Sequence, residues 1–335
     1  MSIPSLTDSH GRTHTTLRIG LTERCNLRCV YCMPAQGIPV TPTAQMLTAP
    51  EIERLVRVLA EAGVDKVRLT GGEPLARKDA VDIAARIGRQ PDVHTLALTT
   101  NGLLLADRLD ALKDAGLTHL TVSLDTLRSD RFEAITRRPG LDRVLDAIDK
   151  ALVTGYSVDG PHPLKVNVVV LREVNEDEVA DFAAWAAEEP IEVRFIEWMP
   201  FGGNAWDRRQ LVPMAETKAR IEDVHGHLAA REDGPHATAR TFTRPGWRGR
   251  IGFIASMSAP FCAGCNRLRV TADGALKVCL FGNREVSLRD ALRSGATDAA
   301  VVGLVHTALR SKAAAHAGMD ALAISDNRPM ITIGG

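Results

Sequence analysis

Residues 18–34 read RIGLTERCNLRCVYCMP, a short strand signal followed at once by three cysteines spaced C-x3-C-x2-C. Cys25, Cys29 and Cys32 therefore sit on the loop that leaves the first predicted strand, residues 17–21. Three thiolates are one fewer than the four that usually hold an iron–sulfur cube. A cube held by only three keeps one iron open to a small molecule, so this loop is a candidate cluster site.

Further β-rich runs follow this loop, and segments with helical periodicity separate them. The predicted strands after the first are residues 66–70, 95–100, 119–124, 164–171 and 192–198, and the clearest helical segments are 50–62, 104–115 and 176–188. Alternating strands and helices predict βαβ units with right-handed crossovers and a parallel sheet. A closed barrel takes eight such units. Six units predict an α/β fold of the incomplete (βα)6 TIM-like barrel type.

Most of the predicted strands end in turns rich in reactive or small residues. These turns read TERCNLRC, TGGEP, TTNG, SLDT and EWMP. In parallel α/β folds, the active site gathers at the carboxyl ends of the strands. We therefore expect these turns to meet on one face of the barrel.

The pattern changes after Pro200, which divides the chain into a partial barrel over residues 1–200 and a C-terminal extension over 201–335. In the extension we predict helices at 214–228, 288–293 and 297–316, strands at 236–244 and 251–256, and a hairpin at 268–280 with a two-residue turn at Asp273-Gly274. The extension carries the other cysteines, Cys262, Cys265 and Cys279, spaced C-x2-C-x13-C. This second trio predicts a second cluster with an open iron.

Composition narrows the class of protein. The formal net charge is zero, which gives no overall electrostatic support for binding nucleic acid or an acidic membrane. No apolar run approaches the roughly 20 residues of a membrane span, and the first residues are polar without a signal-peptide core. We therefore predict a cytoplasmic protein with reduced thiols, no membrane association and no nucleic-acid partner.

The cysteine loop at the end of the first strand resembles that of the radical S-adenosylmethionine (SAM) enzymes. The resemblance implies a [4Fe-4S] cluster on the first trio whose open iron binds SAM, which is then cleaved to a 5′-deoxyadenosyl radical. The positions that match SAM contacts of this superfamily are Tyr31, Gly72, Ser123 and Met199. Taken singly, Gly72 suits a helix entry, Ser123 a turn and Met199 core packing, and a structural zinc site is the alternative for the thiols.

The two cysteine blocks together resemble the GTP 3′,8-cyclase family of molybdenum-cofactor biosynthesis. The matching segments include VRLTGGEP at 67–74, KVNVVV at 165–170, RFIEWMP at 194–200 and FCAGCNRLRVTADG at 261–274. This resemblance implies a second [4Fe-4S] cluster that binds the purine of GTP, and a terminal Gly334-Gly335 tail that reaches the active site. The positions that match GTP contacts are Arg18, Arg68, Thr99, Lys165, Arg267, Leu268 and Arg269.

The basic residues also have a reading independent of any family. Arg18, Arg68, Lys165 and a further candidate, Arg194, lie on predicted strands, where an unpaired charge costs several kcal/mol. Placement around an anion inside the barrel explains them together. Pairing with Glu73, Asp125, Glu192 or Glu197 is the alternative for any one of them. We read Arg137-Arg138 and Arg208-Arg209 as solvated surface.

The resemblance implies a lyase that converts GTP to 3′,8-cyclo-7,8-dihydro-GTP, the first step of molybdopterin synthesis. Its partners would be an unidentified electron donor and the downstream cyclic pyranopterin synthase. The oligomeric state, with a homodimer as one option, and the proton donor of the last step stay open. Two alternatives remain: a radical SAM peptide- or protein-modifying enzyme with an auxiliary cluster, and a zinc-stabilised binding protein without catalysis.

Overall fold

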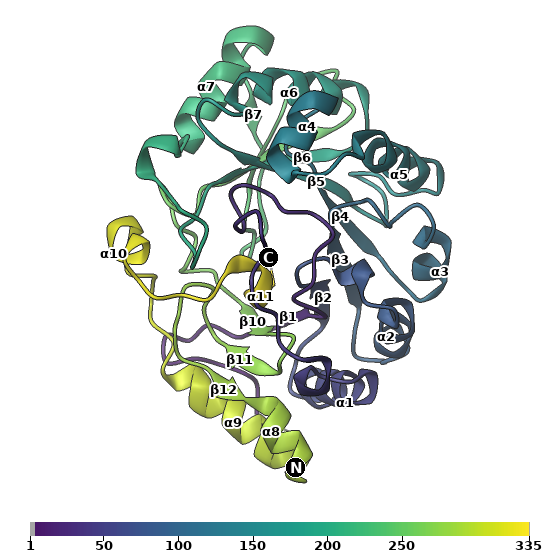
Figure 1. Ribbon diagram of the computed structural model, residues 1–335, viewed down its shortest axis with the longest axis vertical. Helices are drawn as coiled ribbons and strands as arrows, with labels where there is room; N and C mark the ends of the chain where they lie inside the picture. Colours follow the sequence, from purple (N-terminus) through teal and green to yellow (C-terminus); the bar gives the residue numbers. More distant parts are fainter. Residues whose placement is uncertain (1–3, 335) are drawn as a thin grey trace.

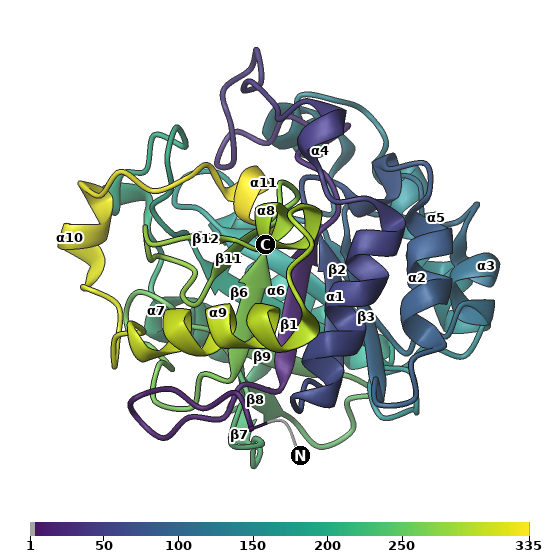
Figure 2. The same ribbon diagram turned by 90° about the horizontal axis from the view of Figure 1, so that it is seen from below.

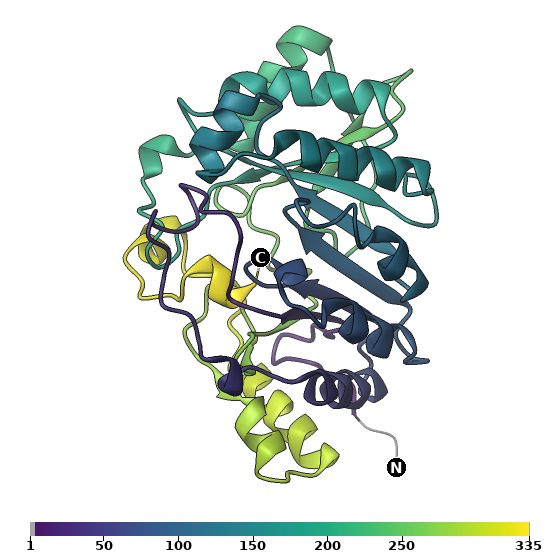
Figure 3. The same cartoon turned by 45° about the vertical axis from the view of Figure 1, so that its right-hand side comes forward.

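The computed structural model describes residues 4–334 and contains one large, mostly parallel sheet. Six consecutive parallel strands form its centre: β1 (Thr16–Gly20), β2 (Lys66–Thr70), β3 (Thr95–Thr100), β4 (His119–Ser123), β5 (Leu164–Val170) and β6 (Glu192–Glu197). The strands curve into an open barrel with helices outside it (Figures 1 and 3). The predicted α/β partial barrel is confirmed.

The outer helices bury one apolar face each against this sheet. They are α1 (Ala49–Glu61), α2 (Ala80–Gly88), α3 (Leu109–Asp114), α4 (Ser129–Thr136), α5 (Leu141–Val153) and α6 (Val179–Glu188). In α1, Ile52, Leu55 and Leu59 are fully buried at helical spacing. The helix begins at a capping box in which the Thr48 and Glu51 side chains each bond the other's backbone N–H.

The C-terminal part of the chain adds strands to both edges of the same sheet. β9 (Arg250–Ile254) pairs in parallel with β6, and β10 (Arg267–Val270) pairs in parallel with β1. The remaining strands lie outside these two in antiparallel pairs: β7 (Ala229–Ala230), β8 (Arg240–Thr243), β11 (Ala275–Lys277) and β12 (Val286–Ser287). Within the described residues, the outermost strands β12 and β7 do not pair, so the sheet stays open.

The C-terminal part of the chain also forms helices, most of which lie at the margins of the barrel. They are α7 (Met214–His225), α8 (Leu288–Arg293), α9 (Asp298–Arg310), α10 (Met319–Ala323) and α11 (Met330–Ile333). The last of them brings the C-terminal end of the chain back to the middle of the barrel, as two perpendicular views show (Figures 1 and 2). In the part of the chain that the structure describes, no helix is long and apolar enough to cross a bilayer.

Several predicted boundaries were wrong. The helix predicted at 104–115 begins only at Leu109, because residues 102–108 form consecutive tight turns. The hairpin loop has three residues, 272–274, since Thr271 N–H bonds Ala275 O, and Gly274 takes a φ of +81°. The strand predicted at 236–244 is confined to β8, and the helix predicted at 214–228 ends at His225, before Gly226.

Strand alternation decides which side chains enter the barrel. In β5, Leu164, Val166 and Val168 are buried against the helices, whereas Lys165 and Asn167 alternate with them and line the interior cavity. The pairing register aligns Arg269 of β10 with Arg18 of β1, and Arg18 with Arg68 of β2. Three arginines on adjacent strands are therefore level with one another inside the barrel.

Candidate active site

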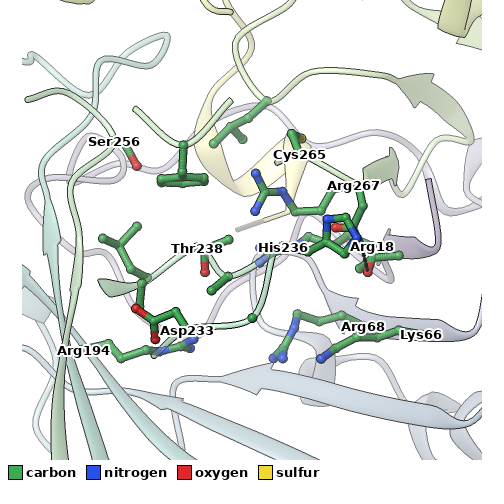
Figure 4. A pocket seen from close by; sticks show the side chains of 18 of the residues that line it. Arg18, Lys66, Arg68, Arg194, Asp233, His236, Thr238, Ser256, Cys265 and Arg267 are labelled. Carbon is green, nitrogen blue, oxygen red and sulfur yellow. Dashed lines mark hydrogen bonds between the residues drawn. The ribbon is translucent and has the colours of Figure 1, made fainter. Parts of the chain in front are cut away.

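A cavity of about 760 Å³ occupies the barrel interior. Arginine and lysine side chains from many strands surround it, and Figure 4 shows Arg18, Arg68, Arg194 and Arg267 around one common space. Of the residues expected to contact GTP, those that line the cavity are Arg18, Arg68, Thr99, Lys165, Arg267 and Arg269, and Arg194 and Lys66 join them. The structure thus brings together basic residues that lie as far apart as 18 and 269 in the sequence.

Leu268 is the exception among these predicted contacts. It lies between Arg267 and Arg269 on β10, so its side chain points to the opposite face of the sheet. That side chain is fully buried in the apolar core. Only the backbone of Leu268 is left to contact a ligand.

The arginines of the cavity have few counter-charges. Among residues 4–334, no carboxylate lies within 4.0 Å of Arg18, Arg68, Arg267 or Arg269. Arg68 donates instead to Thr99 Oγ1 and Thr121 Oγ1, both at 3.1 Å, so Thr99 also orients this arginine. Buried cations without partners are costly. The predicted alternative of ion pairing therefore fails for this row.

Arg18 lies at the centre of this row. Its buried Nε has no hydrogen-bond partner within the described part of the chain. Burial, followed by repulsion from Arg269 and Arg68, lowers the pKa of Arg18 well below its usual range. A buried N–H donor without a partner among the described residues, next to two other positive charges, is typical of a site that binds an anion.

The carboxylate of Glu192 neutralises one side of the cavity. Its oxygens lie 3.4 Å from Lys165 Nζ, 3.9 Å from Arg194 Nε and 2.9 Å from Arg250 Nη2. Burial and then the Arg194 charge still lower the pKa of Lys165 to about 8. One glutamate shared by three cations leaves net positive charge in the cavity.

The first cysteine loop is held by the turn that follows β2. Gly72 N–H donates to Thr22 O at 2.7 Å and Glu73 N–H donates to Arg24 O at 2.8 Å. A Cβ on Gly71 would lie 2.4 Å from Thr22 O, and one on Gly72 would lie 2.6 Å from Arg24 O. The two glycines are therefore required for the close approach of this turn to the backbone that leads into Cys25.

The three cysteines of this loop are half-buried, and carboxylates lie near them. Burial raises the pKa of Cys29, and the Asp125 charge adds to the effect; burial and the neighbouring Cys25 raise the pKa of Cys32 to about 12. Cys25 Sγ accepts from Leu27 N–H at 3.4 Å and from Asn101 Nδ2 at 3.8 Å. Protonated thiols in the metal-free protein would give up their protons on binding a cluster.

A cube and a single zinc ion make different demands on their ligands. Across residues 4–334, no three His, Cys, Asp or Glu side chains converge tightly enough to hold one metal ion. A zinc site needs ligands that meet at one point, whereas a cube presents a separate iron to each thiolate. Three cysteines within eight residues supply the three ligands that a cube with one open iron needs.

Of the residues expected to contact SAM, Tyr31 lies on this loop and Gly72 packs against it, whereas Met199 packs on the apolar cluster of Leu211, Met257 and Leu322. Tyr31 Oη donates to Asp125 Oδ2 at 2.7 Å, and Trp198 Nε1 donates to Tyr31 O at 3.2 Å. Ser123 ends β4 and aligns with Asn167 of β5. Met199 lines the large cavity, whereas Tyr31, Gly72, Ser123 and the first cysteine trio are outside its lining.

The second cysteine trio opens directly onto the basic cavity. Cys262, Cys265 and Cys279 all line it, and the Arg267 guanidinium lies 4.9 Å from the ring centre of Phe261. Although burial opposes it, the charges of Arg267 and then Lys312 lower the pKa of Cys265 to about 7. This trio therefore sits in a positive environment, the opposite of the first trio.

The end of the chain reaches the row of arginines. Arg269 Nη1 donates to Gly334 O at 2.8 Å. A Cβ on Gly334 would lie 2.5 Å from Thr70 Oγ1, so the tail packs tightly against β2. Gly335, the other residue of the predicted tail, lies outside the described residues.

Sequence reasoning missed residues that support both cysteine loops. Arg137, which we expected on the solvated surface, donates to Arg28 O at 2.7 Å and to Met33 O at 3.1 Å, so it clamps the first loop. Arg12 donates to Cys262 O at 2.9 Å and Lys312 to Cys265 Sγ at 3.4 Å. These basic residues lie outside both cysteine motifs, so the sequence does not indicate that they contact the cysteine loops.

Comparisons with known proteins agree with this geometry. Residues 19–186 match the family model of the radical SAM superfamily, and residues 191–318 match that described as Molybdenum Cofactor Synthesis C. Among solved structures, Streptococcus suis SuiB bound to S-adenosylmethionine is similar, with a TM-score of 0.60 and 14% identity over 87% of this chain and 66% of that chain. At this identity the likeness shows the fold alone.

Full-length similarity identifies the family. The chain is 51% identical to the mitochondrial GTP 3′,8-cyclase of Arabidopsis thaliana, over 98% of this chain and 83% of that protein. It is 41% identical to GTP 3′,8-cyclase of Syntrophomonas wolfei, over 98% and 99%. It is also 50% identical to human molybdenum cofactor biosynthesis protein 1 over 98% of this chain, but spans only 51% of that longer protein. The chain therefore belongs to the GTP 3′,8-cyclase family of the radical SAM superfamily.

Proposed function

We propose that this protein converts GTP to 3′,8-cyclo-7,8-dihydro-GTP, the first step of molybdopterin synthesis. One observation carries the proposal: a cavity of about 760 Å³ is lined both by the second cysteine trio and by arginines that have no carboxylate within 4.0 Å among residues 4–334, namely Arg18, Arg68, Arg267 and Arg269. GTP needs the same combination, cations for its phosphates and an open iron for its purine. Arginine forks suit phosphate because they donate paired hydrogen bonds.

Two cofactor sites follow from the two trios. Cys25, Cys29 and Cys32 would hold a [4Fe-4S] cluster with SAM, and Cys262, Cys265 and Cys279 a second cluster, which divides the roles between residues 1–200 and 201–335. When bound, the first cluster and SAM supply a 5′-deoxyadenosyl radical that removes hydrogen from the ribose of GTP. Tyr31, Gly72, Ser123 and Met199 would orient SAM.

The chain's own residues bind and orient the substrate. The aligned row of Arg269, Arg18 and Arg68 would take the triphosphate, because these groups lack carboxylate partners within the described residues and point into one space. Lys165 would add a contact from the opposite wall. Fixed cations around a bound nucleotide hold the ribose in one place, and this positioning is the main contribution of the protein.

The remaining parts of the proposal concern partners and place in the cell. An external one-electron donor would serve the first cluster, and cyclic pyranopterin synthase would take the product. We place the protein in the cytoplasm; a homodimer is compatible with this function but not required by it. The zinc-stabilised binding protein and the peptide-modifying enzyme are not favoured, because neither accounts for full-length similarity to proteins named GTP 3′,8-cyclase.

An anaerobic assay tests the proposal. The protein is reconstituted with iron and sulfide, its iron is counted, and SAM, dithionite and GTP are added. Eight irons, GTP-dependent formation of 5′-deoxyadenosine and a product with the mass of GTP are expected. SAM cleavage without a product from GTP would show that GTP is not the substrate. A content of four irons would show that the second trio holds no cluster.

A further inference from the structure

Lys312 is a buried lysine directly beside the second cysteine trio. It follows the end of α9 and has an exposed fraction of 5%. Its Nζ lies 3.4 Å from Cys265 Sγ, 3.3 Å from Arg267 O and 2.7 Å from His14 Nε2. A lysine ammonium has three N–H donors and no acceptor. Each donor of Lys312 therefore has one acceptor, and one of these is a predicted cluster ligand.

His14 fixes the direction of this hydrogen-bond network. His14 is fully buried, and its Nδ1 lies 3.1 Å from Leu6 O, which only accepts. Nδ1 therefore carries the imidazole proton, and Nε2 is left to accept from Lys312. The lysine is thus held on one side by a neutral histidine, and its remaining donors point toward the cysteine loop.

The segment before β1 forms hydrogen bonds to the second cysteine loop and to the segment that carries Lys312. Arg12 donates to Cys262 O at 2.9 Å and to Ala314 O and Ala313 O, both at 2.8 Å. Asp8 Oδ2 accepts from Arg12 Nε at 2.6 Å and holds the guanidinium in place. The N-terminal segment therefore ties the second cysteine loop to the segment that carries Lys312.

Within residues 4–334, no cation lies at hydrogen-bond distance from a sulfur of the first cysteine trio; Arg28 donates to the backbone oxygen of Cys25 instead, at 2.6 Å. The sulfur contacts of this trio within the described residues are neutral amide groups, from Leu27 and Asn101 on Cys25. The carboxylate of Asp125 is a charged group close enough to raise the pKa of Cys29 in this trio. Hydrogen bonds to sulfur and local charge set the reduction potential of iron–sulfur clusters. The two sites therefore have different electrostatic environments, and Lys312 contributes to the difference.

We propose that Lys312 is a positioning residue that donates a charge-assisted N–H···S hydrogen bond to Cys265 and raises the reduction potential of the cluster held by the second trio. The reduced cluster carries one more negative charge than the oxidised one, so a cation at hydrogen-bond distance stabilises the reduced form. This inference rests on the proposed second cluster. It adds a role for a residue that contacts neither substrate nor iron.

A redox titration of the full-length reconstituted protein tests it. Dithionite with mediators poises the protein, and electron paramagnetic resonance follows each cluster. Wild type should show two one-electron steps, and the step that remains in Cys29→Ser belongs to the second cluster. Lys312→Met should make reduction of that cluster about tenfold less favourable, which is about 59 mV for one electron. The other step should stay in place, and Lys312→Arg should restore much of the shift.

The control is Lys218→Met. Lys218 is a half-buried lysine on α7 that pairs with Glu222 and lies 5.3 Å from the ring centre of Phe242. This variant should leave both potentials unchanged. A shift of equal size in Lys218→Met and Lys312→Met would overturn the inference, as would unchanged potentials in Lys312→Met with eight irons bound.

Iron content separates the possible failures. Wild type with only four irons would refute the second cluster and with it this inference, whereas the proposed function is tested separately by the GTP-dependent product. If Lys312→Met loses four irons and Lys312→Arg keeps eight, the potential of Lys312→Arg decides: a value near that of wild type supports the inference, and a fall of about 59 mV or more overturns it. Loss of the same iron from both variants would overturn it, because the charge would then not matter.

Discussion

Gly71→Ala tests the close contact that holds the first cysteine loop. The added Cβ would lie 2.4 Å from Thr22 O, where ordinary contact begins at 3.4 Å, so the backbone must move apart by 3.4 − 2.4 = 1.0 Å. Gly71 also has a φ of +141°, which an alanine adopts with strain. We expect the free energy of unfolding to fall by about 1–3 kcal/mol from backbone strain and by about 1–3 kcal/mol from overpacking.

Gly155→Ala separates these two costs. Gly155 has a φ of +96°, but a Cβ there would meet no atom within 4 Å. Gly155→Ala should lower the free energy of unfolding only by the cost of the strained backbone. The difference between the two variants in urea unfolding of the metal-free protein should therefore be about 1–3 kcal/mol.

The functional consequence is measured as SAM cleavage. A displacement of about 1 Å at a reacting centre costs about 100-fold in rate, so Gly71→Ala should form 5′-deoxyadenosine about 100-fold more slowly while Gly155→Ala stays near wild type. Wild-type cleavage by Gly71→Ala, together with stability equal to that of Gly155→Ala, would refute the reasoning that this turn positions the cysteine loop.

Three other changes test separate parts of the structure. Cys29→Ser should abolish SAM cleavage and leave four irons bound; cleavage that survives would show that the first trio does not hold the SAM cluster. Arg18→Met removes a donor from the middle of the arginine row, so the Kd for GTP, measured by calorimetry, should rise about 10- to 150-fold, from about 1.5–3 kcal/mol; an unchanged Kd would place the phosphates elsewhere. The hydrogen bond from Arg293 lowers the pKa of Glu51 from its ordinary 4.5 to about 2. Because the folded value is the lower one, this stabilisation is present above pH 4.5 and is lost as the pH falls toward 2. Unfolding of the metal-free protein should therefore depend less on pH below 5 in Glu51→Gln, and equal curves for the two proteins would contradict this.

Local sequence patterns predicted the central strands well. The predicted β2 and β3 bounds match the structure, since short β-rich runs between turn residues leave little choice of register. The cost of burying an unpaired charge also predicted Lys165 and Arg18 inside the barrel, and both line the cavity. Strand bounds and side-chain placement of this kind depend on residues close together in the chain, so they can be predicted from the sequence.

Features that depend on distant residues were not predictable in the same way. The helix predicted at 297–316 ends at Arg310, because Lys312 turns inward to His14 and Arg12 captures the carbonyls of Ala313 and Ala314. The pairing of β10 with β1 joins segments about 250 residues apart, and nothing local announces it. The family resemblance supplied Leu268 as a contact, but only the structure shows that its side chain faces the core.

The contact between the N-terminal segment and the second cysteine loop has a consequence for biosynthesis. His10 Nε2 lies 3.1 Å from Lys312 O, a contact between residues 302 positions apart. At about 5–20 residues per second, a ribosome needs roughly 15–60 seconds to make the intervening chain. Cys25, Cys29 and Cys32 and the strands beside them leave the ribosome early, whereas the second site is complete only after release of the last helices. The nascent chain therefore presents its two cysteine trios in a fixed order, and the first three thiols are available well before the basic cavity of the barrel exists.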